Sequence, residues 1–134
     1  MSEEISVFIF VESRYKVNRK RIRTTVVSEL KKHGLSDQSE VSVAFVGNRK
    51  MRQINKKYRD IDKTTNILSF SLTEGEPVVL PPHREGGLKI LRLGDIVLSY
   101  PELIKEAAED EMLVDDKIDE LLVHGLSHLL GIHH

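Results

Sequence analysis

A strictly alternating segment in the first half of the chain most constrains its fold. Apolar and polar residues alternate from Glu40 to Val46, so Val41, Val43 and Phe45 share one side of an extended backbone. This pattern predicts a β-strand with one buried face. Because such a face needs a covering layer, the chain is expected to form a sheet packed against helices.

Two helices are predicted to flank this strand in sequence. The first is expected to begin after Asn18, a good N-cap residue, and to run to about Lys32, with Gly34 as its stop. The second is expected to be capped by Asn48 and to reach Tyr58. The side chains expected to face the core are Ile22, Val26 and Leu30 in the first helix and Met51, Ile54 and Tyr58 in the second.

The rest of the chain mixes strands and helices without strict alternation. Strands are predicted over residues 5–11, 65–72 and 90–99, a helix from Pro101 to about Asp110, and a last helix from about Leu113 to Leu130. Prolines and glycines concentrate in residues 73–87, which are predicted to form a loop or a ragged hairpin. These elements indicate an α/β or α+β fold, a small mixed β-sheet layered with helices, in a single domain spanning residues 1–134.

Composition excludes several classes of protein. The 134-residue chain has no cysteine, so it forms no disulfide, and any zinc would be held by His, Asp or Glu. No apolar run is long enough to cross a bilayer, and acidic rather than basic residues precede the first apolar stretch, which argues against a signal peptide. We therefore expect a cytoplasmic protein that does not enter membranes.

Charge is distributed unevenly along the chain. Residues 1–63 carry 15 Lys and Arg against 8 Asp and Glu, whereas residues 64–134 carry 5 against 13. The basic residues form two clusters, within residues 14–23 and 49–59. These clusters either follow a phosphate backbone or form the solvated faces of two helices, and charge alone leaves both interpretations open.

The last eleven residues, HGLSHLLGIHH, hold the side chains that indicate chemistry. His124 and His128 are four residues apart, so on a helix they lie only about 40° apart and can converge on one metal ion. His134 could not reach that ion on a continuing helix, but Gly131 can adopt a positive φ, end the helix and let the chain fold back. Three imidazoles with a fourth position for water are typical of a catalytic metal site.

Other interpretations of these histidines remain open. A histidine pair on an apolar helix is often only partly buried imidazole, histidines at a chain end can belong to a purification tag, and a metal site can be purely structural. Gly125 stands where the HExxH motif of zinc proteases has its general base, so that mechanism is not supported. A bound metal would itself have to lower the pKa of a water molecule, helped by another group.

Three ordered blocks of the sequence resemble the YbeY family of bacterial endoribonucleases. HGLSHLLGIHH is similar to the family pattern HGxLHLxGxDH, with His133 in place of the Asp. INKKYRDIDKTTNILSF, at residues 54–70, resembles LNxxYRxxDxxTDVLSFP, and LGDIVLS, at residues 93–99, resembles the family's GDI strand. The resemblance covers about residues 48–134, and the first 45 residues match only in type.

The resemblance implies a fold, a metal and a reaction. It implies a compact α/β fold with a zincin-like metal-binding helix at the C-terminus, and one Zn²⁺, or another divalent transition metal, bound by His124, His128 and His134. It also implies cleavage of single-stranded RNA in ribosomal RNA maturation and quality control. The substrate would be an rRNA precursor, the partners would be the ribosome or its proteins, and no DNA is expected. Arg59 falls on the family's functionally important arginine, and a guanidinium can clamp two phosphate oxygens.

Further polar residues are candidates for supporting the metal site. Asp95 follows Gly94 at the start of a strand, and a turn or strand-start role is its alternative. Asn66 and Ser69 could face the groove beside the metal or bond only to local backbone. His133 could stand in for the Asp of the pattern as a supporting residue.

Two other functions are alternatives. One is a metallohydrolase of peptides or small molecules, which an acidic groove beside the histidines would favour. The other is a ribosome-associated binding protein with structural zinc, which a closed fourth coordination position would favour.

Overall fold

The computed structural model describes residues 5–35, 38–72 and 91–131. Its elements in chain order are β1 (Ser6–Val11), α1 (Arg19–Lys32), β2 (Ser39–Val46), α2 (Asn48–Arg59), β3 (Ile67–Ser71), β4 (Leu91–Ser99), α3 (Tyr100–Glu109) and α4 (Val114–Leu129). The predicted mixture of strands and helices is confirmed. The loop predicted over residues 73–87 lies outside the described residues.

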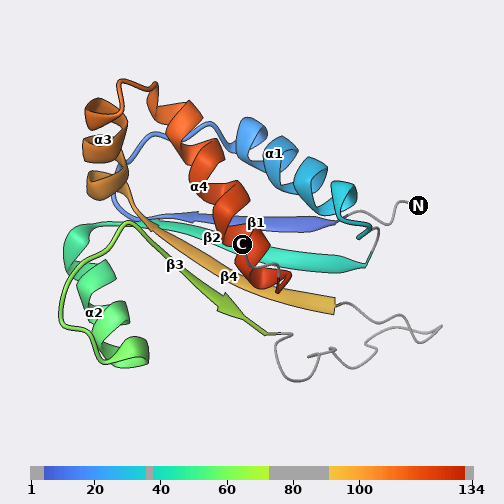
Figure 1. The fold of residues 1–134 in the computed structure, drawn as a ribbon, viewed down its shortest axis with the longest axis horizontal. Coiled ribbons are helices and arrows are strands. Elements are labelled where there is room, and N and C mark those ends of the chain that lie inside the picture. Colours follow the sequence, from blue (N-terminus) through green and yellow to red (C-terminus); the bar gives the residue numbers. More distant parts are fainter. Residues whose placement is uncertain (1–4, 36–37, 73–90, 132–134) are drawn as a thin grey trace.

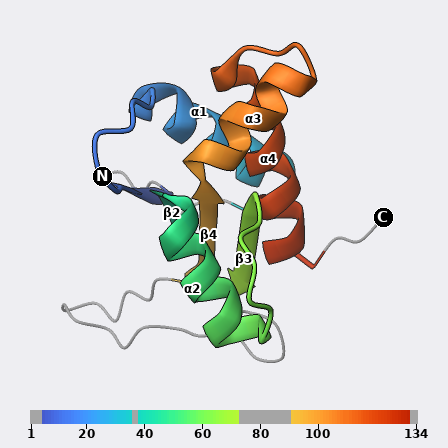
Figure 2. The same cartoon turned by 90° about the vertical axis from the view of Figure 1, so that its left-hand side faces the viewer.

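The four strands form one sheet in the order β1-β2-β4-β3. β1 pairs in parallel with β2, and β2 with β4, whereas β3 is antiparallel to β4 and lies at the edge. Figure 1 shows α1 and α4 side by side over one face of the sheet and α2 against the other face. The edge strand β3 therefore lies between α4 and α2, as Figure 2 shows.

The larger core fills the space between the sheet and the helices α1, α3 and α4. The predicted inward residues of α1 and β2 are all buried there: Ile22, Val26, Leu30, Val41, Val43 and Phe45. At the rim of this layer, Arg21 joins α1 to α4, with its Nη2 atom 2.6 Å from Asp116 and 2.8 Å from Asp119. The buried apolar side chains hold α4 on the sheet, and this ion pair joins it to α1.

Local sequence sets most helix ends as expected. The Asn18 side chain caps α1 by accepting a hydrogen bond from Arg21 N at 3.0 Å. Gly34 has a φ of 88° after the same helix. Asn48, however, is not the cap of α2, because Gly47 takes that position. The Asn48 Oδ1 atom instead accepts a hydrogen bond from Ser99 Oγ at 2.6 Å, which ties the start of α2 to the end of β4.

A smaller apolar cluster joins α2 to the opposite face of the sheet. Met51 is fully buried there with Val46, Leu68 and Val97. The predicted burial of Tyr58 was wrong, because its side chain is 62% exposed. Tyr58 lies on the same side of α2 as Met51, but two turns further along the helix, past the end of this small cluster.

Candidate active site

The last helix, α4, presents the predicted histidine pair to solvent. His124 and His128 are both exposed, and their ring centroids lie 4.5 Å apart with 49° between the ring planes. The two imidazoles meet because residues four apart share one face of a helix. Imidazole nitrogens are preferred donors for zinc and related metals, so the chemistry of the pair fits such an ion.

The opposite face of α4 fixes the direction in which these histidines point. Four leucines at helical spacing are buried against the sheet and α1: Leu121, Leu122, Leu126 and Leu129. Because this apolar face must be buried, the histidine face is turned outward. Gly131 follows the helix with a φ of 75°, the conformation expected for its end.

The third predicted ligand cannot be placed. His134 and the neighbouring His133 lie outside the described residues. Within residues 5–35, 38–72 and 91–131, no group of three or more His, Cys, Asp or Glu side chains is arranged to hold a metal ion. His134 as third ligand and His133 as its support remain predictions.

Gly125 allows α4 to pack closely on β3 and β4. A Cβ atom at this position would lie 3.2 Å from Ile67 Cδ1, from Ile96 Cδ1 and from Ser69 Oγ, which is tighter than ordinary van der Waals contact. The glycine between the two histidines therefore has a packing role where zinc proteases carry a catalytic glutamate. It also places the histidine helix directly against the edge strand.

The structure brings only one of the described supporting candidates to α4. Ser69 is on the face of β3 that α4 covers, with its hydroxyl beside Gly125. Asn66 belongs to a different network, since its Nδ2 atom donates to the carboxylate of Glu106 in α3 at 3.0 and 3.2 Å. Its backbone oxygen accepts from Ser99 N at 2.9 Å.

Asp95 lies on the other face of the sheet. Strand pairing sets Ile96 opposite Ser69, and both approach Gly125 of α4. Asp95, one residue earlier, pairs with Phe70 and lines a hollow under α2. Because successive strand residues point to opposite faces, the sheet separates Asp95 from the histidines.

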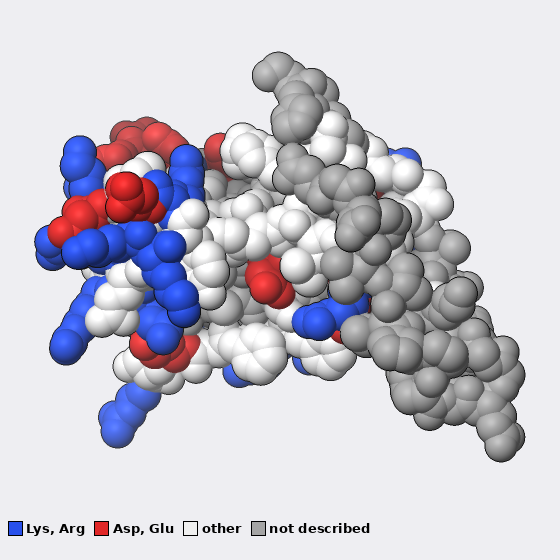
Figure 3. Space-filling view, turned by 90° about the horizontal axis from the view of Figure 1, so that it is seen from below, with Lys and Arg blue, Asp and Glu red and all other residues white. Residues whose placement is uncertain are grey.

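Arg59 is the last residue of α2, and its side chain is exposed. No hydrogen bond or ion pair with another described residue occupies its guanidinium group. Lys and Arg side chains gather over the end of the molecule that carries α2 (Figure 3). Because α2 and α4 lie on opposite faces of the sheet, Arg59 is separated from the histidines by the edge strand β3.

Sequence reasoning missed the hollow under α2. Its volume is about 550 Å³, and it is lined by side chains from α2, β3 and β4, including Tyr58, Phe70 and Asp95. The sequence signal that could have indicated it is the alternation over residues 69–72, where Phe70 and Leu72 share the face opposite Ser69 and Ser71.

A mixed four-stranded sheet with an imidazole pair on its last helix defines a small α/β protein with a candidate metal centre. The chain belongs to the endoribonuclease YbeY family, whose sequence pattern matches residues 9–134. The predicted resemblance is thereby confirmed, and so is the prediction of a hydrolase of the endoribonuclease class. The family is one of metal-dependent nucleases, and RNA is the substrate that its name specifies.

Individual relatives support this assignment. The chain is 38% identical to endoribonuclease YbeY of Desulforamulus reducens over 115 residues, which is 86% of this chain and 72% of the relative. It is 42% identical to that of Shouchella clausii, over 75% of this chain and 62% of the relative. It is 32% identical to that of Acinetobacter baumannii, over 93% of this chain and 75% of the relative. The chain thus spans between 62% and 75% of the length of these relatives.

A solved structure has the same fold. The solution structure of TM1509 from Thermotoga maritima superposes with a TM-score of 0.57 at 20% sequence identity, covering 96% of this chain and 74% of the other. This likeness confirms the predicted fold. In the part of the chain that the structure describes, no helix is long and apolar enough to cross a membrane.

Proposed function

We propose that this chain is a metal-dependent endoribonuclease that cleaves single-stranded RNA in ribosomal RNA maturation and quality control, with residues 1–134 acting as one domain. The observation that carries the proposal is the pair of exposed imidazoles of His124 and His128, 4.5 Å apart, in a chain of an endoribonuclease family. A ligand pair on a well-packed helix is held ready for a metal ion, because the supporting helix is rigid.

One Zn²⁺, or another divalent transition metal, would be held by His124, His128 and His134. Bound there, the ion would supply Lewis acidity toward a phosphoryl oxygen or a water molecule of lowered pKa. The chain has no thiolate ligand to offer, so histidine is its natural zinc donor. His133, next to the third ligand, is proposed to support it.

The other roles fall to side chains of this chain. Arg59 would donate two parallel hydrogen bonds to a phosphate of the RNA and stabilise the charge that develops during cleavage, with the RNA passing around the edge strand β3 from the histidines to α2. The basic side chains of α2 would add affinity for the RNA backbone that does not depend on sequence. Ser69 lies beside Gly125 on the α4 side of the edge strand, and its hydroxyl would donate a hydrogen bond to the bound RNA.

The same proposal names the setting of the reaction. An rRNA precursor would be the substrate, the ribosome or its proteins would be the partners, and the compartment would be the cytoplasm. The basic helix α2 supports a polyanionic substrate, since a cluster of Lys and Arg attracts phosphates at long range.

Metal analysis combined with RNA cleavage tests the proposal. The wild-type chain should contain the metal and cleave a single-stranded RNA but not its duplex. His128→Ala should lose both metal and cleavage. His33→Ala is the matched control, because His33 is the C-cap of α1 and, among the described residues, its side chain bonds only to Glu29.

Three results would contradict the proposal. One is cleavage by His128→Ala at the wild-type rate. Another is a wild-type chain that hydrolyses peptides and leaves RNA intact. A third is a wild-type chain that keeps its metal and binds RNA without cutting it, which would instead fit a structural ion.

A further inference from the structure

The face of the sheet turned away from α4 is only partly covered by the described elements, with α2 at one end (Figure 1). Two rows of side chains run across its four strands in register. These rows are Phe8, Ser42, Asp95 and Phe70, and next to them Phe10, Ala44, Val97 and Leu68. We call the surface formed by the two rows the open sheet face.

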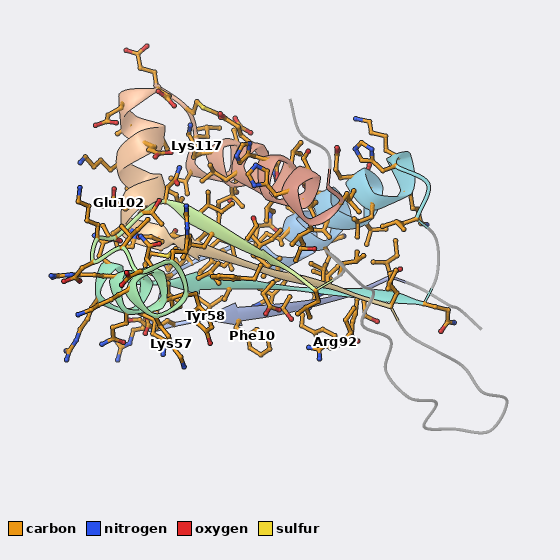
Figure 4. All side chains as sticks on the ribbon, turned by 60° about the horizontal axis from the view of Figure 1, so that its bottom comes forward. Phe10, Lys57, Tyr58, Arg92, Glu102 and Lys117 are labelled. Atoms are coloured by element: carbon orange, nitrogen blue, oxygen red, sulfur yellow. The ribbon has the colours of Figure 1, made fainter. Side chains whose placement is uncertain are left out.

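Aromatic side chains are exposed on this surface. Phe8 is 45% exposed and Phe10 58% exposed, both on β1. At the other edge, the ring of Tyr58 is tilted over that of Phe70, with centroids 5.3 Å apart. Figure 4 shows Phe10 and Tyr58 on the same side of the sheet, with Lys57 and Arg92 beyond them.

The hollow of about 550 Å³ lies at the α2 end of the open sheet face. Its walls combine the Tyr58 and Phe70 rings with Lys50 and Lys57 of α2. The Lys57 Nζ atom lies 5.2 Å from the centre of the Tyr58 ring. Among the described residues that line the hollow, Asp95 is the only acidic one.

We propose that the open sheet face binds two or three unpaired nucleotides of RNA and that the hollow takes a guanine base. The inference rests on the proposed function for RNA as the substrate, and it adds a subsite with base preference on the face opposite the histidines. Exposed aromatic rings on a sheet stack unpaired bases. Phe8 and Phe70 are three strand spacings apart, about 14 Å, which is room for two or three stacked nucleotides.

The charges around the hollow favour RNA over other occupants. Lys50 and Lys57 suit phosphate groups, and Arg59 and Lys56 continue the basic stripe along α2. An acidic peptide would meet the same lysines but would be repelled by Asp95. A nucleotide suits both the lysines and Asp95, because its phosphate is an anion while its base edge offers N–H donors.

Guanine is the base that Asp95 selects. An ionised carboxylate is a pure acceptor with two oxygens, and guanine presents two adjacent donors, N1–H and N2–H, on one edge. Adenine, cytosine and uracil each offer only one donor group on that edge, and an acceptor lies next to it. Among the described residues, no hydrogen bond or ion pair occupies the Asp95 carboxylate, so it is available for a ligand.

A titration of the full chain with GMP, AMP, CMP and UMP, followed through backbone amide NMR signals, tests this subsite. These ligands contain no phosphodiester bond, so binding is measured apart from cleavage. In the wild type, GMP should perturb the amides of Tyr58, Asp95 and Val97 and bind about tenfold more tightly than AMP. Asp95→Asn should remove this preference.

Variants of Tyr58 separate stacking from folding. Tyr58→Ala should weaken all four ligands by about tenfold, and Tyr58→Phe should restore them because the ring is retained. Leu113→Ala is the control, since Leu113 is 72% exposed and precedes α4, away from the hollow. Perturbations elsewhere on the chain, equal affinities for the four nucleotides, or a preference for GMP that survives Asp95→Asn would overturn the proposal.

Different results would contradict the subsite and the proposed function. His128→Ala should bind GMP as the wild type does while losing RNA cleavage. A wild-type chain that binds GMP in the hollow but never cleaves RNA would keep the subsite and remove the proposed function. A chain that cleaves RNA without a response at Tyr58, Asp95 and Val97 would do the reverse.

Discussion

Arg59 ends α2, on the face of the sheet opposite the histidines of α4. Its guanidinium group is exposed, so a phosphate can reach it without displacing protein contacts. Arg59→Ala should therefore leave the metal content unchanged and lower RNA cleavage by about 10²–10³, the usual effect of removing one preorganised charge contact. Metal analysis and cleavage rates measured on the same preparation check both halves.

A matched arginine at the other end of the helix serves as the control. Arg49 is exposed in the first turn of α2, and Arg49→Ala should have a much smaller effect. If Arg59→Ala loses its metal, or cleaves RNA at the wild-type rate, Arg59 has another role.

At the scale of elements, a buried lysine of α4 links that helix to the end of α3. The Lys117 side chain is 3% exposed, and its Nζ atom donates to Asp110 at 2.6 Å and to Glu120 at 3.2 Å. The hydrogen bond to Asp110, the C-cap of α3, raises the pKa of Lys117 above its ordinary value. Asp110→Asn should lower the midpoint of denaturant unfolding, because the buried ammonium group loses the negative charge of its nearer partner.

The pH dependence of this effect follows from the raised pKa of Lys117. The stabilisation is complete below the unfolded value of 10.5 and is lost as pH rises through the higher folded value. The gap in stability between wild type and Asp110→Asn should thus be full at neutral pH and shrink in strong alkali. Glu109→Gln, at the exposed neighbouring acid, should show no such gap.

At the scale of the whole molecule, the fold does not depend on the candidate metal centre. The helix α4 is held by its buried leucines and by the ion pair of Arg21 with Asp116 and Asp119. Chelation should therefore abolish RNA cleavage while far-ultraviolet circular dichroism and cooperative thermal unfolding persist. Added metal should raise the unfolding temperature, because it binds the native state. Global unfolding on chelation would show that the ion is part of the core.

The sequence alone determined the elements and the histidine pair. Each helix and strand was predicted within about two residues of its observed bounds, because periodicity and end signals are local properties of the chain. His124 and His128 could be paired for the same reason, since four residues on one helix define their geometry.

Only the tertiary structure decided which face of the sheet each side chain serves. Alternation shows that Asp95 and Ile96 point opposite ways, but it does not say that α4 covers Ile96 while Asp95 lines a hollow beside α2. Asp119 of α4 likewise pairs with Arg21, 98 positions earlier in the chain, and no local pattern predicts that contact. The close packing of Gly125 and the exposure of Tyr58 were also decided by the tertiary structure. Close packing and exposure depend on which elements meet across the molecule, and no local pattern records those long-range contacts.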